Sequence, residues 1–189
     1  GGGGCGGEGE DGKAQEGGEG MTGMGGDKSG GQILGRGADG RDAGQYHHGA
    51  FEGVTWENSD LRAWMNGDFY DDAFTPVQRG LIETVHNENA DQSITGASGG
   101  AATDDRVFAL SETESVIYLN TPAARSDIGA APASVSAAAG PLSVSEDGTA
   151  DWWLRSPGTY GFATQFVDAS GVPSLSGANV DLQYGVRPA

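Results

Sequence analysis

Nearly all the large apolar side chains of this chain lie in its later part, and this distribution limits most strongly what it can fold into. The first 31 of its 189 residues include 16 glycines, whereas all the Trp, Tyr and Phe residues follow Ile33. A segment whose large apolar side chains are only Met21 and Met24 buries too little surface to offset the entropy lost on ordering. We therefore predict a flexible, Gly-rich, acidic tail over residues 1–31 and one folded domain over residues 32–189.

Removal of residues 1–31 is therefore expected to leave the thermal unfolding midpoint nearly unchanged. The physical reason is that the predicted tail adds no large apolar surface to the core. Thermal melts of the full and shortened chains, followed by circular dichroism, measure the difference. A large drop in the midpoint of the shortened chain would show that this segment supplies a strand to the domain.

The charge of the chain bears on the kind of partner it can bind. The formal net charge is −17, and every basic residue after Lys28 is an arginine, without any basic stripe. A field of this sign repels phosphate backbones, so we exclude nucleic acid as the main partner. No apolar run approaches the ~20 residues that cross a bilayer, and no signal peptide is recognisable. We therefore expect no membrane span.

Motifs that would indicate catalysis are missing from the sequence. Cys5, the one cysteine, lies in the predicted tail, which excludes a disulfide framework and a thiolate site in the core. Residues 96–100 (GASGG) fit the bare GxSxG pattern, but they lie in the Gly/Ser-rich stretch 87–102 that is predicted as a loop, and there is no phosphate-binding loop. We therefore expect a protein that is not an enzyme and that needs no cofactor.

Helix signals come early in the folded part. Ser59 precedes an apolar face at helical spacing, formed by Leu61, Trp64 and Met65. Thr75 and Gln78 form a capping box with Pro76 between them, which predicts a second helix. Its apolar positions are Val77, Leu81, Ile82 and Val85. Another capping box at residues 111–114 predicts a short helix that ends at Leu119.

Strand signals dominate the last third. Short apolar runs at residues 32–35, 106–110, 152–154 and 162–167 are typical of strands, and a turn is predicted at residues 168–171. Strict alternation over residues 179–186 predicts one strand with a single buried face. Residues 87–102 and 121–149 are rich in polar and small residues and are predicted as loops. Early helices followed by an antiparallel β-meander indicate the α+β class.

Four segments resemble motifs of a known family. Residues 55–66 (TWENSDLRAWMN) resemble TWENSxLRxWLN, and residues 105–111 (DRVFALS) resemble DKVFLLS. Residues 152–158 (WWLRSPG) and 185–189 (GVRPA) resemble WWLRSPG and GVRPAL. In this order they resemble a family of bacterial and phage domains of unknown function. That family is related to the variable proteins of diversity-generating retroelements and to the formylglycine-generating enzyme fold.

The resemblance implies a C-type-lectin-like fold and a non-catalytic module that recognises a protein or carbohydrate ligand. It further implies display on a cell surface or a phage particle. The cysteines on which formylglycine-generating relatives depend are absent from the core. The family strand reading IxWxVL is replaced here by Gly-rich sequence, a departure expected to expose a sheet edge. The alternative function is a structural or oligomerising domain of a larger phage or envelope assembly; the oligomeric state stays open.

In retroelement-diversified relatives, the residues between the SPG and VRP segments form the exposed binding face. Carried onto this chain, the resemblance implies the ligand-binding residues Thr159, Tyr160, Phe162, Ser174, Ser176, Asn179, Asp181 and Gln183. Tyr160 and Phe162 also flank a glycine in a predicted loop, a setting that suits rigid aromatic contacts. The alternative is that these are ordinary polar loop residues that bind no ligand.

The motif segments supply residues to which we assign structural roles. They are Trp56, Arg62, Trp64, Trp152, Trp153, Arg155 and Arg187. The three arginines could jointly bind a carboxylate or a sulfate, or each could hold a different loop through hydrogen bonds and ion pairs. We favour the second, structural role. In a strand, adjacent Trp152 and Trp153 point to opposite faces, so we expect one to be buried and the other exposed.

Metal binding has little support in the sequence. His47, His48 and His86 would bind zinc only if the fold brought them together, and adjacent histidines on an extended segment point apart. Calcium remains open because carboxylates are abundant, but no DxDxDG loop accompanies them. The aspartates concerned are Asp71, Asp72, Asp104, Asp105 and Asp168.

Overall fold

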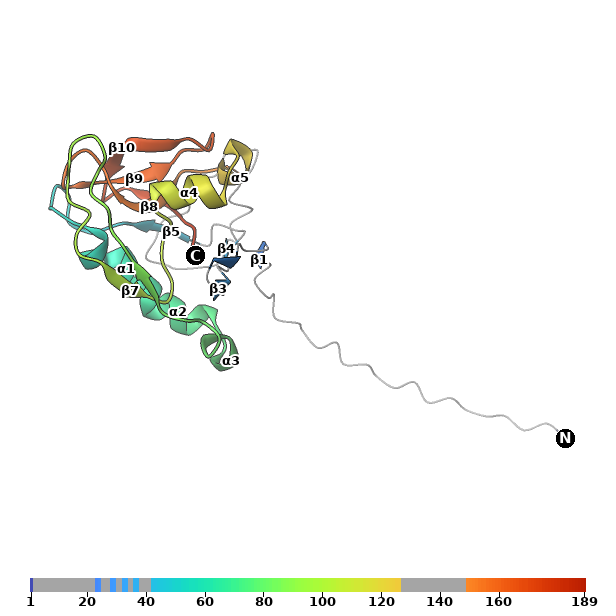
Figure 1. Ribbon diagram of the computed structural model, residues 1–189. Helices are drawn as coiled ribbons and strands as arrows, with labels where there is room; N and C mark the ends of the chain where they lie inside the picture. The colour runs from blue at the N-terminus through green and yellow to red at the C-terminus, as the bar shows by residue number, and fades with distance from the viewer. Residues whose placement is uncertain (2–22, 25–27, 30–31, 34–35, 38–41, 127–148) are drawn as a thin grey trace.

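The computed structural model describes residues 1, 23–24, 28–29, 32–33, 36–37, 42–126 and 149–189. Its centre is a five-stranded sheet in the order β10-β9-β8-β11-β5 (Figure 1). The strands are β5 (Asp42–Gln45), β8 (Trp152–Pro157), β9 (Ala163–Val167), β10 (Pro173–Asn179) and β11 (Gln183–Val186). Only the central pair, β8 and β11, is parallel. The α+β class and the late antiparallel strands are therefore confirmed.

Short helices accompany the sheet. They are η1 (Trp56–Asn58), α1 (Asp60–Asn66), α2 (Asp68–Ala73), α3 (Pro76–Arg79), α4 (Glu112–Tyr118) and α5 (Pro122–Ser126). In Figure 1, α1, α2 and α3 follow one another away from the sheet. A separate two-stranded sheet pairs β6 (Val85–Asn87) with β7 (Thr103–Asp105). The long segment between β6 and β7 agrees with the predicted loop.

Two further strand pairs involve the start of the chain. β1 (Gly23–Met24) pairs with β4 (Arg36–Gly37), and β2 (Lys28–Ser29) pairs with β3 (Gln32–Ile33). Within the described residues, neither pair joins the five-stranded sheet. The remainder of the predicted tail, half of the predicted strand at residues 32–35, and most of the predicted loop at residues 121–149 lie outside the described residues.

The predicted helix starts are confirmed. The hydroxyl oxygens of Ser59, Thr75 and Ser111 each accept a hydrogen bond from the backbone N–H three residues later. The apolar stripe predicted for the second helix is wrong, because α3 ends at Arg79 and the Val77 and Leu81 side chains are 76% and 78% exposed. A cap starts a helix, but a helix this short is extended only when a face is buried.

The single strand predicted over residues 179–186 is also wrong. β10 ends at Asn179, a turn closed by the Leu182 N–H to the Asn179 carbonyl follows, and β11 begins at Gln183. Val180 is buried inside this turn, whereas Leu182 is largely exposed. An alternating pattern fits one long strand and two strands joined by a tight turn equally well. In the run predicted as a strand at residues 106–110, Arg106 is exposed and the other four residues are buried. Ala109 forms an isolated bridge to Pro188, and the run is not part of a strand.

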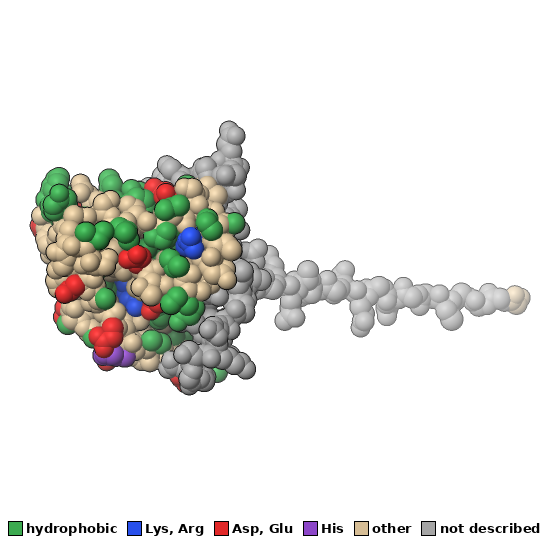
Figure 2. Space-filling view, turned by 45° about the horizontal axis from the view of Figure 1, so that its top comes forward, with side chains coloured by type: hydrophobic (Ala, Val, Ile, Leu, Met, Phe, Trp, Pro, Cys, Tyr) green, Lys and Arg blue, Asp and Glu red, His purple; other side chains and the backbone are tan. Residues whose placement is uncertain are grey.

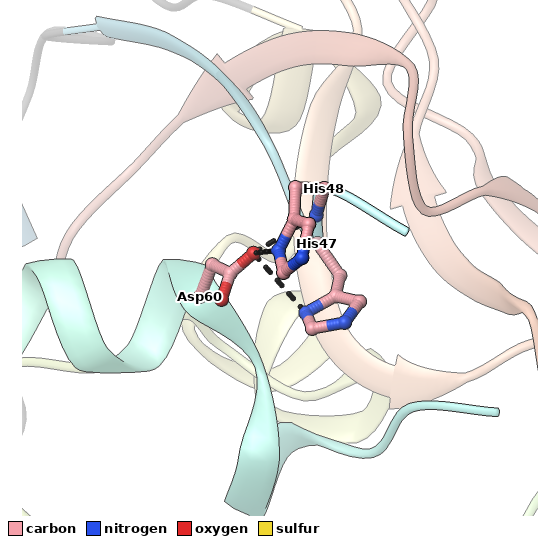
Figure 3. A group of neighbouring side chains, drawn as sticks. All are labelled: His47, His48 and Asp60. Atoms are coloured by element: carbon pink, nitrogen blue, oxygen red, sulfur yellow. Dashed lines mark hydrogen bonds and ion pairs between the residues drawn. The ribbon is translucent and has the colours of Figure 1, made fainter. Parts of the chain in front are cut away.

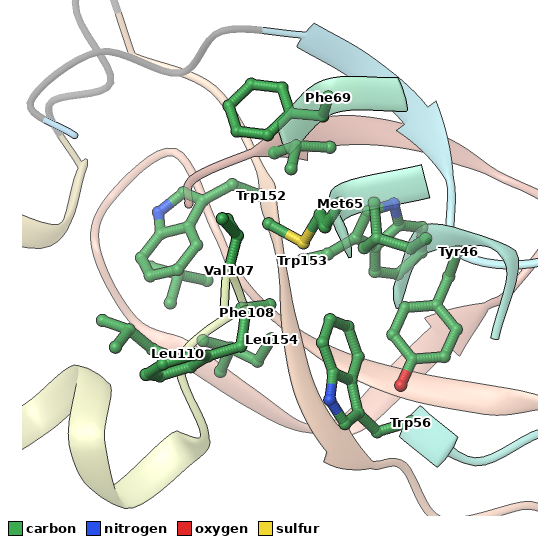
Figure 4. Packing of buried hydrophobic residues seen from close by; sticks show 14 of the residues in the cluster. Tyr46, Trp56, Met65, Phe69, Val107, Phe108, Leu110, Trp152, Trp153 and Leu154 are labelled. Carbon is green, nitrogen blue, oxygen red and sulfur yellow. The ribbon is translucent and has the colours of Figure 1, made fainter. Parts of the chain in front are cut away.

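Both tryptophans of β8 belong to the core, which corrects the expectation that one is exposed (Figure 4). The Trp153 ring packs 5.9 Å from Tyr46 and 4.5 Å from Tyr184, measured between ring centroids. On the other face, the Trp152 indole N–H donates to the Arg125 carbonyl oxygen at 2.9 Å. A strand covered on both faces buries successive side chains, as parallel-paired central strands do.

Candidate functional site

A buried carboxylate joins the first motif segment to the sheet of β6 and β7. Asp105 accepts hydrogen bonds from the Trp56 indole N–H at 2.9 Å and the Arg62 Nε at 2.6 Å. Thr103 and Asn87 donate to it as well, at 2.7 and 3.0 Å. Burial opposes the charged form, but these donors outweigh it and hold the pKa of Asp105 below its ordinary value. Arg62 therefore has a structural role, because it links α1 to the buried carboxylate of β7.

The other two motif arginines are held by different groups. Arg155 is buried, pairs through both terminal nitrogens with Glu114, and donates to the Ala109 carbonyl at 3.0 Å. Arg187 donates to the Ala124 carbonyl at 3.1 Å and lies 5.4 Å from the Trp152 ring. Each guanidinium is thus occupied by its own protein partners. These contacts agree with separate structural ties rather than one shared anion clamp.

Three aromatic side chains gather on the surface beside the turn between β8 and β9, and we call Phe51, Tyr160 and Phe162 the aromatic cluster. The rings of Tyr160 and Phe162 stack with centroids 5.4 Å apart, and Phe51 meets Phe162 edge-on at 5.2 Å. Phe51 and Tyr160 are 69% and 62% exposed. Large apolar side chains contacting one another in solvent offer a ready-made contact surface.

Hydrogen bonds between loops distant in sequence build this cluster. The Val54 N–H donates to the Gly161 carbonyl at 2.8 Å, which joins the loop bearing Phe51 to the turn between β8 and β9. Phe51 has a φ of 60°, a left-handed conformation that a bulky residue rarely adopts. The sequence indicated Tyr160 and Phe162 but missed Phe51, because no local pattern places residue 51 beside residue 162.

Most of the predicted ligand-binding residues lie near this cluster. The Thr159 N–H donates to the Ser176 carbonyl at 3.0 Å, and Asn179 pairs with Ala163, next to Phe162. Ser174 lies farther along β10, opposite Phe166, and its hydroxyl is 3.4 Å from that of Ser176. The structure therefore brings Thr159, Tyr160, Phe162, Ser176 and Asn179 to one end of the sheet.

The remaining two predicted residues lie across the turn. Asp181 is in the turn, where its carbonyl accepts from the Gln45 side chain at 2.6 Å, and Gln183 pairs with Gln45 at the start of β11. One strand over residues 179–186 would have placed Asn179, Asp181 and Gln183 together on its exposed face, and this consequence of the prediction is therefore wrong. The intervening turn puts them on different elements at the same end of the sheet.

The histidines do not group as the sequence suggested. His47 and His48 both turn toward Asp60, with ring centroids 4.6 Å apart, so the expectation that they point apart is wrong (Figure 3). The chain bends after β5, so the rule for an extended strand does not apply to them. His86 lies instead beside Asp104, with Nδ1 2.7 Å from the carboxylate. The hydrogen bond to Asp60 raises the pKa of His48.

Four of the five aspartates considered for calcium have partners within the protein. Asp71 pairs with Arg79 at 2.6 Å, and the Asp168 carboxylate accepts backbone N–H bonds from Ser170 and Val172 within its own turn. Asp104 and Asp105 point to different partners. Among the described residues, the one group with metal-ligand spacing is that of His47, His48 and Asp60.

The fold and surface define a small α+β domain with a rigid, Trp- and Arg-braced scaffold and an exposed aromatic cluster. Figure 2 shows acidic side chains scattered among hydrophobic ones on the face in view. The chain belongs to the family described as a domain of unknown function (DUF6273), whose model matches residues 31–189. No curated protein and no solved structure matches the chain. Within the described part, no helix has the length and apolarity to cross a bilayer.

Proposed function

We propose that this domain recognises a protein or carbohydrate ligand through the aromatic cluster and catalyses no reaction. The observation that carries the proposal is the mutual packing of Phe51, Tyr160 and Phe162 on the surface rather than in the core. Exposed aromatic side chains with few rotatable bonds lose little entropy on binding and are enriched at recognition surfaces.

The surroundings of the cluster suit a ligand with both apolar and polar groups. Thr159, Ser176 and Asn179 line its border, and the exposed Ile94 belongs to a loop whose Thr95 hydroxyl contacts the Thr159 carbonyl at 3.4 Å. A sugar ring presents an apolar face and polar hydroxyls, and a protein surface patch presents both as well. The left-handed Phe51 supports the proposal, since backbone strain of about 1–3 kcal/mol persists where it has a use.

A C-type-lectin-like fold, kinship with retroelement-diversified proteins, and display on a cell or phage surface are part of this proposal. They are supported by the four motifs in order and by the coincidence of the implied binding residues with the aromatic cluster. A structural or oligomerising domain of a larger phage or envelope assembly is the alternative. Under that alternative the aromatic cluster contacts another subunit instead of a separate ligand.

Tyr160→Ala is expected to weaken ligand binding about tenfold or more, since a central aromatic contact contributes about 2 kcal/mol. The labelled chain is first applied to a mixed array of glycans and bacterial surface proteins, with and without EDTA, and the affinity of each hit is then measured in solution. The expected melting temperature is unchanged, because the Tyr160 side chain is largely exposed.

Leu81→Ala is the matched control, because Leu81 is another large, mostly exposed side chain but lies just after α3, away from the sheet. It should bind as the wild-type chain does. Equal loss of binding in both variants would refute the assigned surface. Absence of any hit, together with multimers that Tyr160→Ala dissociates in light scattering, would favour the oligomerising alternative.

A further inference from the structure

His47, His48 and Asp60 form a compact group of metal-ligand type, which we call the His–Asp cluster (Figure 3). The Nδ1 atoms of His47 and His48 lie 3.2 and 2.5 Å from the same carboxylate oxygen of Asp60. One ligand atom from each residue lies within 4.8 Å of the other two. Ligand atoms around a tetrahedral zinc ion are separated by roughly 3.3 Å, given bond lengths of about 2.0–2.1 Å. Small side-chain rotations therefore suffice to enclose an ion.

The backbone fixes this group before any ion arrives. The His47 N–H donates to the Val180 carbonyl at 2.9 Å, and the Leu61 N–H donates to the Tyr46 carbonyl at 3.1 Å. The first bond holds the segment after β5 against the turn between β10 and β11, and the second holds it against the beginning of α1. The His48 N–H also donates to the Asp60 carboxylate at 2.9 Å. Preorganised ligands lose little entropy when a metal binds.

One nitrogen of the group lacks the hydrogen bond that its position would allow. Nδ1 of His47 is buried and makes no hydrogen bond, although the Asp60 carboxylate lies 3.2 Å away. A cation bound between this nitrogen and the carboxylate would give both groups a partner. The other ring nitrogen, Nε2, lies 3.7 Å from the Glu52 carboxylate. Metal-bound histidines commonly direct their second ring nitrogen to a carboxylate, which fixes the tautomer and strengthens the ligand.

From this geometry we propose that His47, His48 and Asp60 bind a divalent transition-metal ion of the zinc type. Two imidazole nitrogens and one carboxylate oxygen favour zinc over calcium and magnesium, which prefer all-oxygen sites. Three protein ligands leave a coordination position for water or for a group on a bound molecule. Glu52 would orient His47 through the second ring nitrogen of that histidine and would not bind the ion itself.

The cluster lies at the same end of the sheet as the aromatic cluster. Val180, which accepts from the His47 N–H, donates its own N–H to the Phe162 carbonyl at 3.2 Å. The segment from His47 to Phe51 is short, so an ion bound here would stiffen the loop that carries Phe51. Zinc binding itself is independent of the proposed ligand and is tested with the ion alone.

Isothermal titration of the EDTA-treated, dialysed full chain with zinc chloride tests this site. We expect one saturable zinc ion per chain and a higher melting temperature in its presence, because a ligand that binds only the folded state stabilises it. His48→Ala and Asp60→Asn should each weaken zinc binding at least about tenfold. Magnesium and calcium should not compete at equal concentration.

His86→Ala is the matched control, since it removes another exposed histidine that faces a carboxylate, and Cys5→Ser removes the one thiol. Both should retain wild-type zinc affinity. Circular dichroism of His48→Ala separates loss of binding from loss of fold, and the exposed position of His48 predicts an intact fold. Absence of saturable zinc binding, or equal affinity in wild-type and His48→Ala chains, would overturn the proposal.

Discussion

Asp105→Ala is expected to lower the free energy of unfolding by about 3–5 kcal/mol, the usual cost of removing one partner from a buried ion pair. The substitution deprives the Arg62 guanidinium of its carboxylate and leaves the buried Trp56 indole N–H and Asn87 amide without this acceptor. These groups join η1, α1, β6 and β7, so the loss reaches most of the early half of the domain. Urea denaturation at neutral pH measures it.

Asp104→Ala provides the neighbouring control. Its carboxylate is exposed and faces His86, and exposed pairs contribute less than about 1 kcal/mol. We expect a small change in the midpoint for this variant. If Asp105→Ala destabilised the domain no more than Asp104→Ala does, the buried carboxylate would not be the centre of the scaffold.

The same group makes stability depend on pH. The pKa of Asp105 is lowered in the folded state, so its stabilising contribution is fully present above the ordinary carboxyl pKa near 3.8. The contribution is lost as the pH falls from there through the lower pKa of the folded state. Asp105→Asn should therefore flatten the acid limb of the stability curve below about pH 4. An unchanged acid limb would contradict this assignment.

Arg155→Met is the second substitution with a large expected effect, a loss of about 3 kcal/mol. Arg155 is buried on β8, and its guanidinium binds Glu114 at the start of α4 and the Ala109 carbonyl. Methionine keeps much of the apolar packing but leaves the Glu114 carboxylate unpaired in a largely enclosed position. The melting temperature and the urea midpoint measure the loss.

Two comparisons isolate the charge pair from the packing. Arg79→Met removes a more exposed arginine that pairs with Asp71 and should cost less than about 1 kcal/mol. Adding Glu114→Gln to Arg155→Met should recover part of the lost stability, because the unpaired carboxylate is then neutral. If the double variant were less stable than Arg155→Met alone, the unpaired charge would not be the cause.

Local chemistry was predictable from the sequence where the partners are close along the chain. Ser59, Thr75 and Ser111 cap helices that begin where expected, because a cap involves residues only three apart. The length of each helix beyond its first turn was not predictable. This length depends on whether tertiary contacts bury the apolar face of the helix. Val77 of α3 and Leu81 just after α3 are both exposed, so such contacts are missing there.

Features that depend on distant partners escaped prediction. The burial of both Trp152 and Trp153 follows from the central place of β8 between β9 and β11. Phe51 joins Phe162 because loops more than 100 residues apart are hydrogen-bonded to each other. The turn around Val180 contains Asn179 and Asp181, which are common in turns, but their alternation with apolar residues fits a strand equally well.

Two of the three residues of the aromatic cluster were predictable from the sequence because they are close along the chain. Tyr160 and Phe162 are close along the chain and flank Gly161, so their shared loop was expected. His47 and His48 were judged by the geometry of an extended strand, whereas the bend after β5 aims both at Asp60. Such a bend is set by contacts of Val180 and α1, not by the histidines themselves.

The most direct test of recognition through the aromatic cluster is the affinity of the Phe51→Ala chain for a ligand captured by the wild-type chain. Phe51 is exposed, and its ring contact within the aromatic cluster is with Phe162. Its removal should therefore leave the melting temperature within about 2 °C of wild type. We predict that affinity falls about tenfold. Equal affinity of a folded Phe51→Ala chain, or no saturable ligand for the wild-type chain, would contradict the assignment.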